Sequence, residues 1–91
     1  MIKIYSYARD NCFTLLRAFG FSFFFFSKEH EPIHVHVMGR DGYAKYVWNG
    51  SEFEFYEQRN VKAKDLKKIK DIIDENSDLI VKYWKMYFKQ D

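Results

Sequence analysis

The chain has 91 residues, of which 47% are hydrophobic and 21% aromatic, and its formal net charge is +2. This length predicts one domain spanning residues 1–91, and the apolar content excludes an intrinsically disordered chain. The small net charge excludes a uniformly basic nucleic-acid-binding surface, and the lone Cys12 excludes both an internal disulfide and a thiolate metal site.

The N-terminal part of the chain carries weak structural signals. Ile2 and Ile4 are compatible with the start of a strand, and residues 13–17 (FTLLR) fit either a strand or a short helical turn. Residues 12–26 are apolar, but they contain Arg17 and are shorter than the roughly 20 residues that a membrane-spanning helix needs. Because a single cysteine also suits a reducing compartment, we expect a soluble cytoplasmic protein with no membrane partner.

From Phe21 the pattern is that of β-strands. Residues 21–26 (FSFFFF) predict a strand with phenylalanines on both faces. Residues 33–38 (IHVHVM) alternate, so that the aliphatic residues face one side and the histidines the other. We therefore expect the valines to point into the core.

Two glycine-containing turns then predict hairpins. Residues 39–42 (GRDG) form the first loop, and Asn49-Gly50 favours a two-residue type I′ turn. The expected fold class is α+β, with an antiparallel meander of about four strands over residues 21–56. Its strands are expected at residues 21–26, 33–38, 43–48 and 52–56.

From residue 63 the apolar residues recur at the spacing of an amphipathic helix. One continuous helix over residues 63–89 would be roughly 40 Å long, more than strands of this length can cover. A break near Asn76, with Ser77 capping a second helix, resolves the mismatch. The C-terminal helical segment (63–89) is expected to cover one face of the sheet.

All three histidines and the only proline lie in residues 30–37 (HEPIHVHV). On a strand, His34 and His36 project from the same face, which suits two ligands of one metal ion or a pair of acid–base catalysts. The simpler interpretation is an exposed polar face on which histidines alternate with valines. Candidates for a third metal ligand are Glu52, Glu54, His30 and Glu31. Because the sequence fixes none of them, we predict no metal and no cofactor, and take His34 and His36 as the candidate catalytic residues.

The candidate binding residues beside this pair are His30, Glu31, Phe24 and Phe26. The phenylalanines fit either the core or a protein-binding surface. In principle the histidines with Arg9, Arg17, Arg40 and Arg59 suit a metal-independent ribonuclease, in which a base activates the 2′-hydroxyl and cations stabilise the phosphorane. The sequence contains no Ser/His/Asp order, phosphate-binding loop, paired-cysteine motif or nucleotide-binding fingerprint.

Four segments occur in combination: GFSFFFFS at 20–27, HEPIHVHV at 30–37, GYAKY at 42–46, and a tail with Leu66, Ile69, Glu75-Asn76, Trp84 and Tyr87-Phe88. Together they resemble the small bacterial family catalogued as domain of unknown function 4160, over roughly residues 19–88. Ile33 stands where members of this family usually carry a second proline.

The resemblance implies a cytoplasmic prokaryotic protein that acts as a toxin–antitoxin component through a small cognate protein partner. RNA is a further expected partner, and a ribonuclease-type toxin is the expected activity if the protein is an enzyme. A non-enzymatic regulatory binding module and a metal-binding protein using His34 and His36 are the alternatives. The small size is also compatible with a homodimer.

Overall fold

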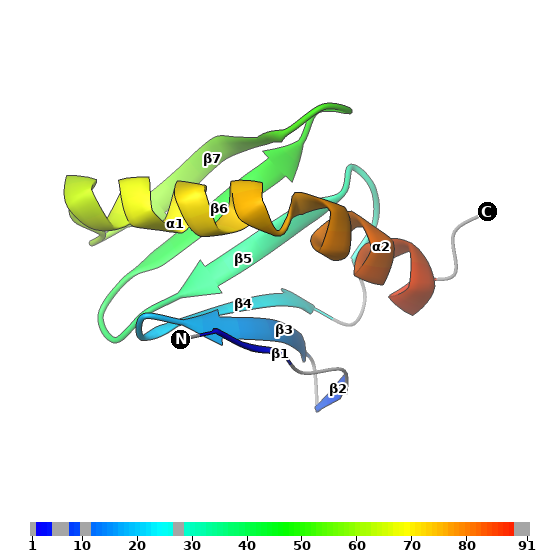
Figure 1. Cartoon of the computed structure of the whole chain (residues 1–91), viewed down its shortest axis with the longest axis horizontal. Helices are drawn as coiled ribbons and strands as arrows, with labels where there is room; N and C mark the ends of the chain where they lie inside the picture. Colours follow the sequence, from blue (N-terminus) through cyan, green and yellow to red (C-terminus); the bar gives the residue numbers. More distant parts are fainter. Residues whose placement is uncertain (1, 5–7, 10–11, 27–28, 89–91) are drawn as a thin grey trace.

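The computed structural model describes residues 2–4, 8–9, 12–26 and 29–88. It confirms the α+β class: an antiparallel sheet is covered on one face by two C-terminal helices (Figure 1). The elements are β1 (Ile2–Ile4), β2 (Ala8–Arg9), β3 (Cys12–Ala18), β4 (Phe21–Phe26), β5 (His34–Met38), β6 (Tyr43–Trp48), β7 (Phe53–Arg59), α1 (Ala63–Glu75) and α2 (Ser77–Tyr87).

The strand order in the sheet is β1-β3-β4-β5-β6-β7, with β2 also paired with β3. Strands β4 to β7 form the predicted meander, and all their pairings are antiparallel. The expectation of about four strands is too low, because β3 and the short β1 and β2 extend the sheet beyond β4. Residues 13–17 are therefore part of a strand and not a helical turn.

A β-bulge explains the irregular pattern of β3. The register between β3 and β4 shifts between Thr14 and Leu16, and a bulge places one extra residue in a strand. As a result the adjacent Leu15 and Leu16 are both fully buried, whereas Arg17 is exposed.

The hairpin between β6 and β7 differs from the predicted type I′ turn. Trp48 pairs with Phe53, so the loop spans residues 49–52, and Gly50 but not Asn49 has a positive φ. The Oδ1 atom of Asn49 accepts hydrogen bonds from the backbone N–H groups of Ser51 and Glu52 at 2.8 and 2.9 Å. This local side-chain bonding favours the longer loop.

The predicted helix break lies at Asn76, whose φ and ψ of −118° and 14° interrupt the helical backbone. Its Nδ2 atom donates a hydrogen bond to the Ile72 carbonyl at 2.7 Å. Ser77 is the first residue of α2, and no side chain caps the helix there, so the capping role expected for Ser77 is wrong. The described part of α2 ends at Tyr87, and residue 89 of the expected segment lies outside the described residues.

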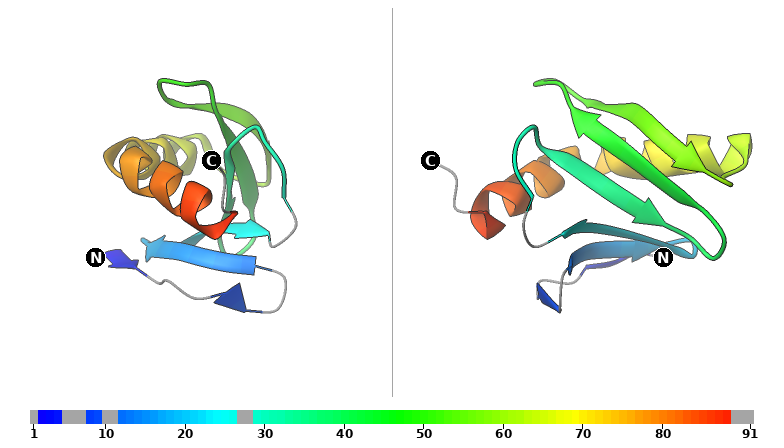
Figure 2. Two further views of the ribbon diagram at one scale, coloured as in Figure 1. Left: turned by 90° about the vertical axis from the view of Figure 1, so that its right-hand side faces the viewer. Right: turned by 180° about the vertical axis from the view of Figure 1, so that it is seen from behind.

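The two helices cover the sheet face that carries the aliphatic residues of β5. The ring of Trp84 in α2 packs against Phe25 with centroids 5.1 Å apart, and the Tyr46 hydroxyl donates to the Leu66 carbonyl of α1 at 3.5 Å. Both helices of the described chain lie on this face, and the opposite face carries neither of them (Figure 2). Among the described residues, neither helix is long and apolar enough to span a membrane.

Candidate functional site

His34 and His36 lie side by side on the sheet face opposite the helices. Their ring centroids are 5.0 Å apart, in agreement with the alternation of β5. Both are buried, with exposed fractions of 8% and 5%, so the interpretation as an exposed polar face is wrong. Residues 29–33 fold back over this face between β4 and β5 (Figure 2) and bring an acidic side chain to the two rings.

That side chain is Glu29. Its Oε2 atom lies 2.5 Å from the Nε2 atoms of both His34 and His36, and its Oε1 atom accepts a hydrogen bond from the Phe26 backbone N–H at 2.8 Å. Burial alone would raise the pKa of Glu29, but the hydrogen bonds from the histidines and Phe26 outweigh it and lower the pKa to about 2. The carboxyl group is therefore ionised at neutral pH. Glu29, His34 and His36 are called the histidine cluster below.

The outer ring nitrogens of the cluster are also hydrogen-bonded. Nδ1 of His34 lies 2.8 Å from the Pro32 carbonyl oxygen, and Nδ1 of His36 lies 2.9 Å from the Tyr43 hydroxyl. Since a carbonyl oxygen only accepts, Nδ1 of His34 must carry a hydrogen. Burial, with Glu57 and Glu29 nearby, raises the pKa of Tyr43, so its hydroxyl keeps its proton.

The arrangement requires positive charge beside Glu29, either as a proton on Nε2 of His34 or as a bound metal ion. When Nδ1 of a neutral His34 carries the hydrogen, its Nε2 presents a lone pair to an ionised carboxylate oxygen. Two lone pairs at 2.5 Å repel each other unless a proton lies between them or a metal ion beside them binds both atoms. One divalent ion satisfies the ligand atoms of Glu29, His34 and His36 together, since these atoms all lie within 4.8 Å of one another.

Aromatic rings wall the cluster. Phe24 is buried and stacks on His36 at 5.4 Å, and the half-exposed Phe26 meets the same ring edge-on at 4.6 Å. Trp84 reaches His34 from the helix layer, with centroids 5.0 Å apart. It can do so because the pairing of β4 with β5 ends at Phe24–His36, beyond which the two strands separate.

The structure brings His34 and His36 together with Phe24 and Phe26, but not with the other candidate binding residues. His30 and Glu31 are exposed and do not contribute to the cluster.

Neither Glu52 nor Glu54 is the third ligand. Glu54 lies in the same row as His34, with Val47 of β6 between them. Glu52 instead forms an ion pair with Lys70 of α1 at 3.0 Å. Sequence reasoning missed Glu29, whose only signal is an acidic residue in the loop before the HxH strand, a description that Glu31 fits equally well.

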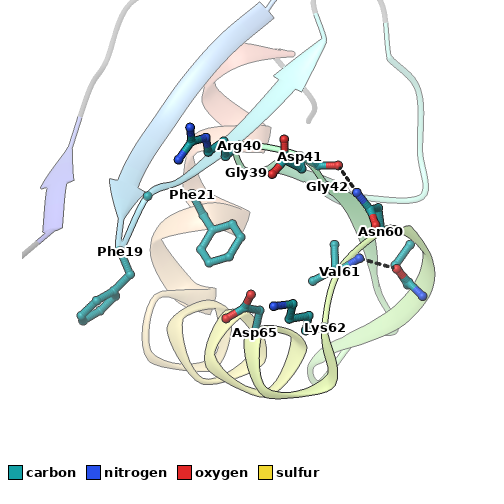
Figure 3. Close-up of a pocket in the computed structure, with 12 residues that line it drawn as sticks. Phe19, Phe21, Gly39, Arg40, Asp41, Gly42, Asn60, Val61, Lys62 and Asp65 are labelled. Carbon is teal, nitrogen blue, oxygen red and sulfur yellow. Dashed lines mark hydrogen bonds between the residues drawn. The ribbon is translucent and has the colours of Figure 1, made fainter.

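A separate hollow of about 570 Å³ lies where the start of β4, the β5–β6 hairpin and the first turn of α1 meet (Figure 3). Phe21 points into it, and its charged lining residues have both signs: Arg40, Asp41, Lys62 and Asp65. No residue of the histidine cluster lines this hollow.

One family model matches residues 20–85, and its description is Domain of unknown function (DUF4160). The match covers all residues of the histidine cluster. No curated protein and no solved structure matches the chain. The toxin–antitoxin role and the protein, RNA and homodimer partners named above therefore stay predictions.

Proposed function

Since this chain belongs to the DUF4160 family, whose description names no activity, we propose a function from the site itself: the protein binds one divalent transition-metal ion through Glu29, His34 and His36. The observation that carries the proposal is the convergence within 4.8 Å of three ligand atoms, one from the partly buried Glu29 and two from buried histidines. Two imidazoles and one carboxylate form a ligand set used for catalytic zinc and for non-haem iron(II).

The outer hydrogen bonds support this function. Histidines that bind metals usually donate their other ring N–H to a carbonyl, a carboxylate or water, which fixes the tautomer and orients the ring. The Pro32 carbonyl has this role for His34, and the Tyr43 hydroxyl oxygen can accept from Nδ1 of His36 in the same way. With Nδ1 as the donor, each Nε2 presents its lone pair beside the Glu29 carboxylate, where both can ligate the same metal ion as Oε2.

The same contacts argue against His34 or His36 as a metal-independent general base. A general base needs a ring nitrogen with a free lone pair facing the substrate. Here Nδ1 and Nε2 of both rings already have partners within the protein. As metal ligands, by contrast, all four nitrogens have a function.

Three protein ligands are one fewer than a structural zinc site uses. The remaining coordination positions are available to water or to a substrate, and a bound metal ion lowers the pKa of such a water towards neutrality. The proposed centre is therefore suited to hydrolytic or other Lewis-acid chemistry, and not only to holding the fold together.

Metal analysis tests the proposal. The protein purified without chelators is expected to contain about one zinc or iron per chain by elemental analysis, and the metal-free form is expected to bind Zn²⁺ or Co²⁺ in calorimetric titration. Glu29→Gln, His34→Ala and His36→Ala should each weaken binding by at least about tenfold.

His30→Ala is the matched control, because His30 is exposed and lies in the same loop as Glu29. It should leave metal affinity unchanged. Wild-type protein without bound metal and without micromolar affinity for Zn²⁺, Co²⁺, Fe²⁺ or Mn²⁺ would refute the proposal. Equal losses in the His30 variant and the cluster variants would also refute it.

A further inference from the structure

A second candidate site lies on the same helix-free sheet face, beside the histidine cluster. It is a groove of about 430 Å³ whose lining includes Phe24, the residue that stacks on His36. The other side chains that matter are Thr14, Arg17, Ser22, Met38 and Arg40. We call it the arginine groove.

The strand register shows how close the groove is to the cluster. Residues paired across antiparallel strands point to the same side of a sheet. One row across β3, β4 and β5 contains Thr14, Phe24 and His36. The next row contains Arg17, Ser22 and Met38. The groove therefore begins in the row of the proposed ligand His36 and extends to the next row, roughly 7 Å further along the strands.

The charge of the groove has one sign. Arg17 and Arg40 are the ionisable residues among its described lining, which contains no carboxylate. The hollow of Figure 3, by contrast, has Asp41 and Asp65 beside its cations. Guanidinium groups with hydroxyls, here those of Thr14 and Ser22, are well suited to binding phosphate oxygens.

Exposed apolar side chains flank this polar lining. Phe26 and Met38 have exposed fractions of 41% and 48% on the same face. An exposed aromatic ring next to a cationic groove is the combination that proteins use to bind single-stranded nucleic acids and nucleotides, with bases on the ring and phosphates on the cations.

We propose that the arginine groove binds a nucleotide phosphate or an RNA phosphodiester, with the phosphate against Arg17 and Arg40 and the rest of the ligand extending over Phe24 and Phe26 towards the histidine cluster. Phosphate binding by the groove stands independently of the metal. The placement of the ligand beside a metal ion rests on the proposed function.

Fluorescence anisotropy of a labelled single-stranded RNA of about eight nucleotides measures binding, with AMP and inorganic phosphate as competitors. We expect Arg17→Gln and Arg40→Gln each to weaken binding by about tenfold or more, because each removes a charge-assisted hydrogen bond. Arg40 lies in an exposed hairpin loop, so its variant should fold even if the strand residue Arg17 proves necessary for stability.

Arg59→Gln is the control, since it removes the same charge from an exposed position of β7 that does not line the groove. If AMP or phosphate competes with an affinity similar to that of the RNA, the ligand is a phosphomonoester. If the RNA binds without such competition, the ligand is a phosphodiester. Either result supports the groove, provided that the Arg40 variant is impaired and the Arg59 variant is not.

Equal losses in the Arg40 and Arg59 variants, or no binding of any of the three probes by wild type, would overturn the proposal. Glu29→Gln separates this inference from the proposed function. If the groove is correct, RNA binding survives in that variant while metal binding is lost. If the metal centre is absent, wild type binds no metal but still binds RNA through the groove.

Discussion

Replacing Trp84 with alanine should strongly destabilise the fold. Trp84 is fully buried, and its ring contacts Phe25 of β4, Phe88 and His34 with centroid distances of 5.1, 4.4 and 5.0 Å. Truncating a buried tryptophan costs about 3–5 kcal/mol. A domain of this size has a total stability of roughly 5–14 kcal/mol, so this one side chain accounts for a large part of it.

The position of Trp84 in α2 strengthens the expectation. This helix has 11 residues, and isolated helices shorter than about 12–15 residues are marginal in water, so α2 depends on packing against the sheet. Urea unfolding followed by far-UV circular dichroism should show this loss of unfolding free energy. In thermal unfolding, the melting temperature should be lower by at least about 12 °C.

Met86→Ala provides the control on the same helix, because Met86 is 61% exposed. Its effect should stay within about 0.5 kcal/mol. A loss below about 1 kcal/mol for Trp84→Ala, with an unchanged denaturant dependence, would refute the view that this ring holds α2 on the sheet. It would also mean that the contact between α2 and His34 does not help to hold this helix on the sheet.

Two further substitutions test tight packing and surface charge. A Cβ atom on Gly42 would lie 2.6 Å from the Asn60 carbonyl oxygen. Gly42→Ala should therefore lower the free energy of unfolding by about 1–3 kcal/mol, measured by thermal unfolding. An unchanged melting temperature would contradict this close approach. Lys70 pairs with Glu52 and Asp74 at 3.0 and 2.6 Å, but all three are partly exposed, so Lys70→Met should cost at most about 1 kcal/mol in urea unfolding. A larger loss that persists in high salt would contradict a screened surface network.

The sequence predicts the meander because alternation is a local signal, and it predicts the helix break because helix and strand lengths must match. Alternation in β5 places His34 and His36 on one face. The break at Asn76 follows from length, because one helix over residues 63–89 would be longer than the strands that it covers. Strand β3 is harder to predict, because its bulge buries both Leu15 and Leu16 and so removes the period of two.

The third residue of the histidine cluster could not be predicted, for a different reason. Glu29 reaches the rings from a loop, and the path of a loop depends on tertiary contacts that leave no periodic signal. The prediction of a two-residue turn at Asn49-Gly50 is wrong for a related reason. The Asn49 side chain accepts hydrogen bonds from the backbone of residues 51 and 52 and favours a longer loop.

The edge strand β7 is interrupted in a way that disfavours regular pairing with a further strand. A second bulge interrupts its pairing with β6: Tyr46 lies opposite Phe55 and Lys45 opposite Glu57, which leaves Tyr56 without a partner in the ladder. The ammonium group of Lys45 lies 4.8 Å from the Tyr56 ring. Such a kink gives an incoming strand only a short run of regularly spaced amides and carbonyls, so the bulge protects the sheet from open-ended growth into fibrils.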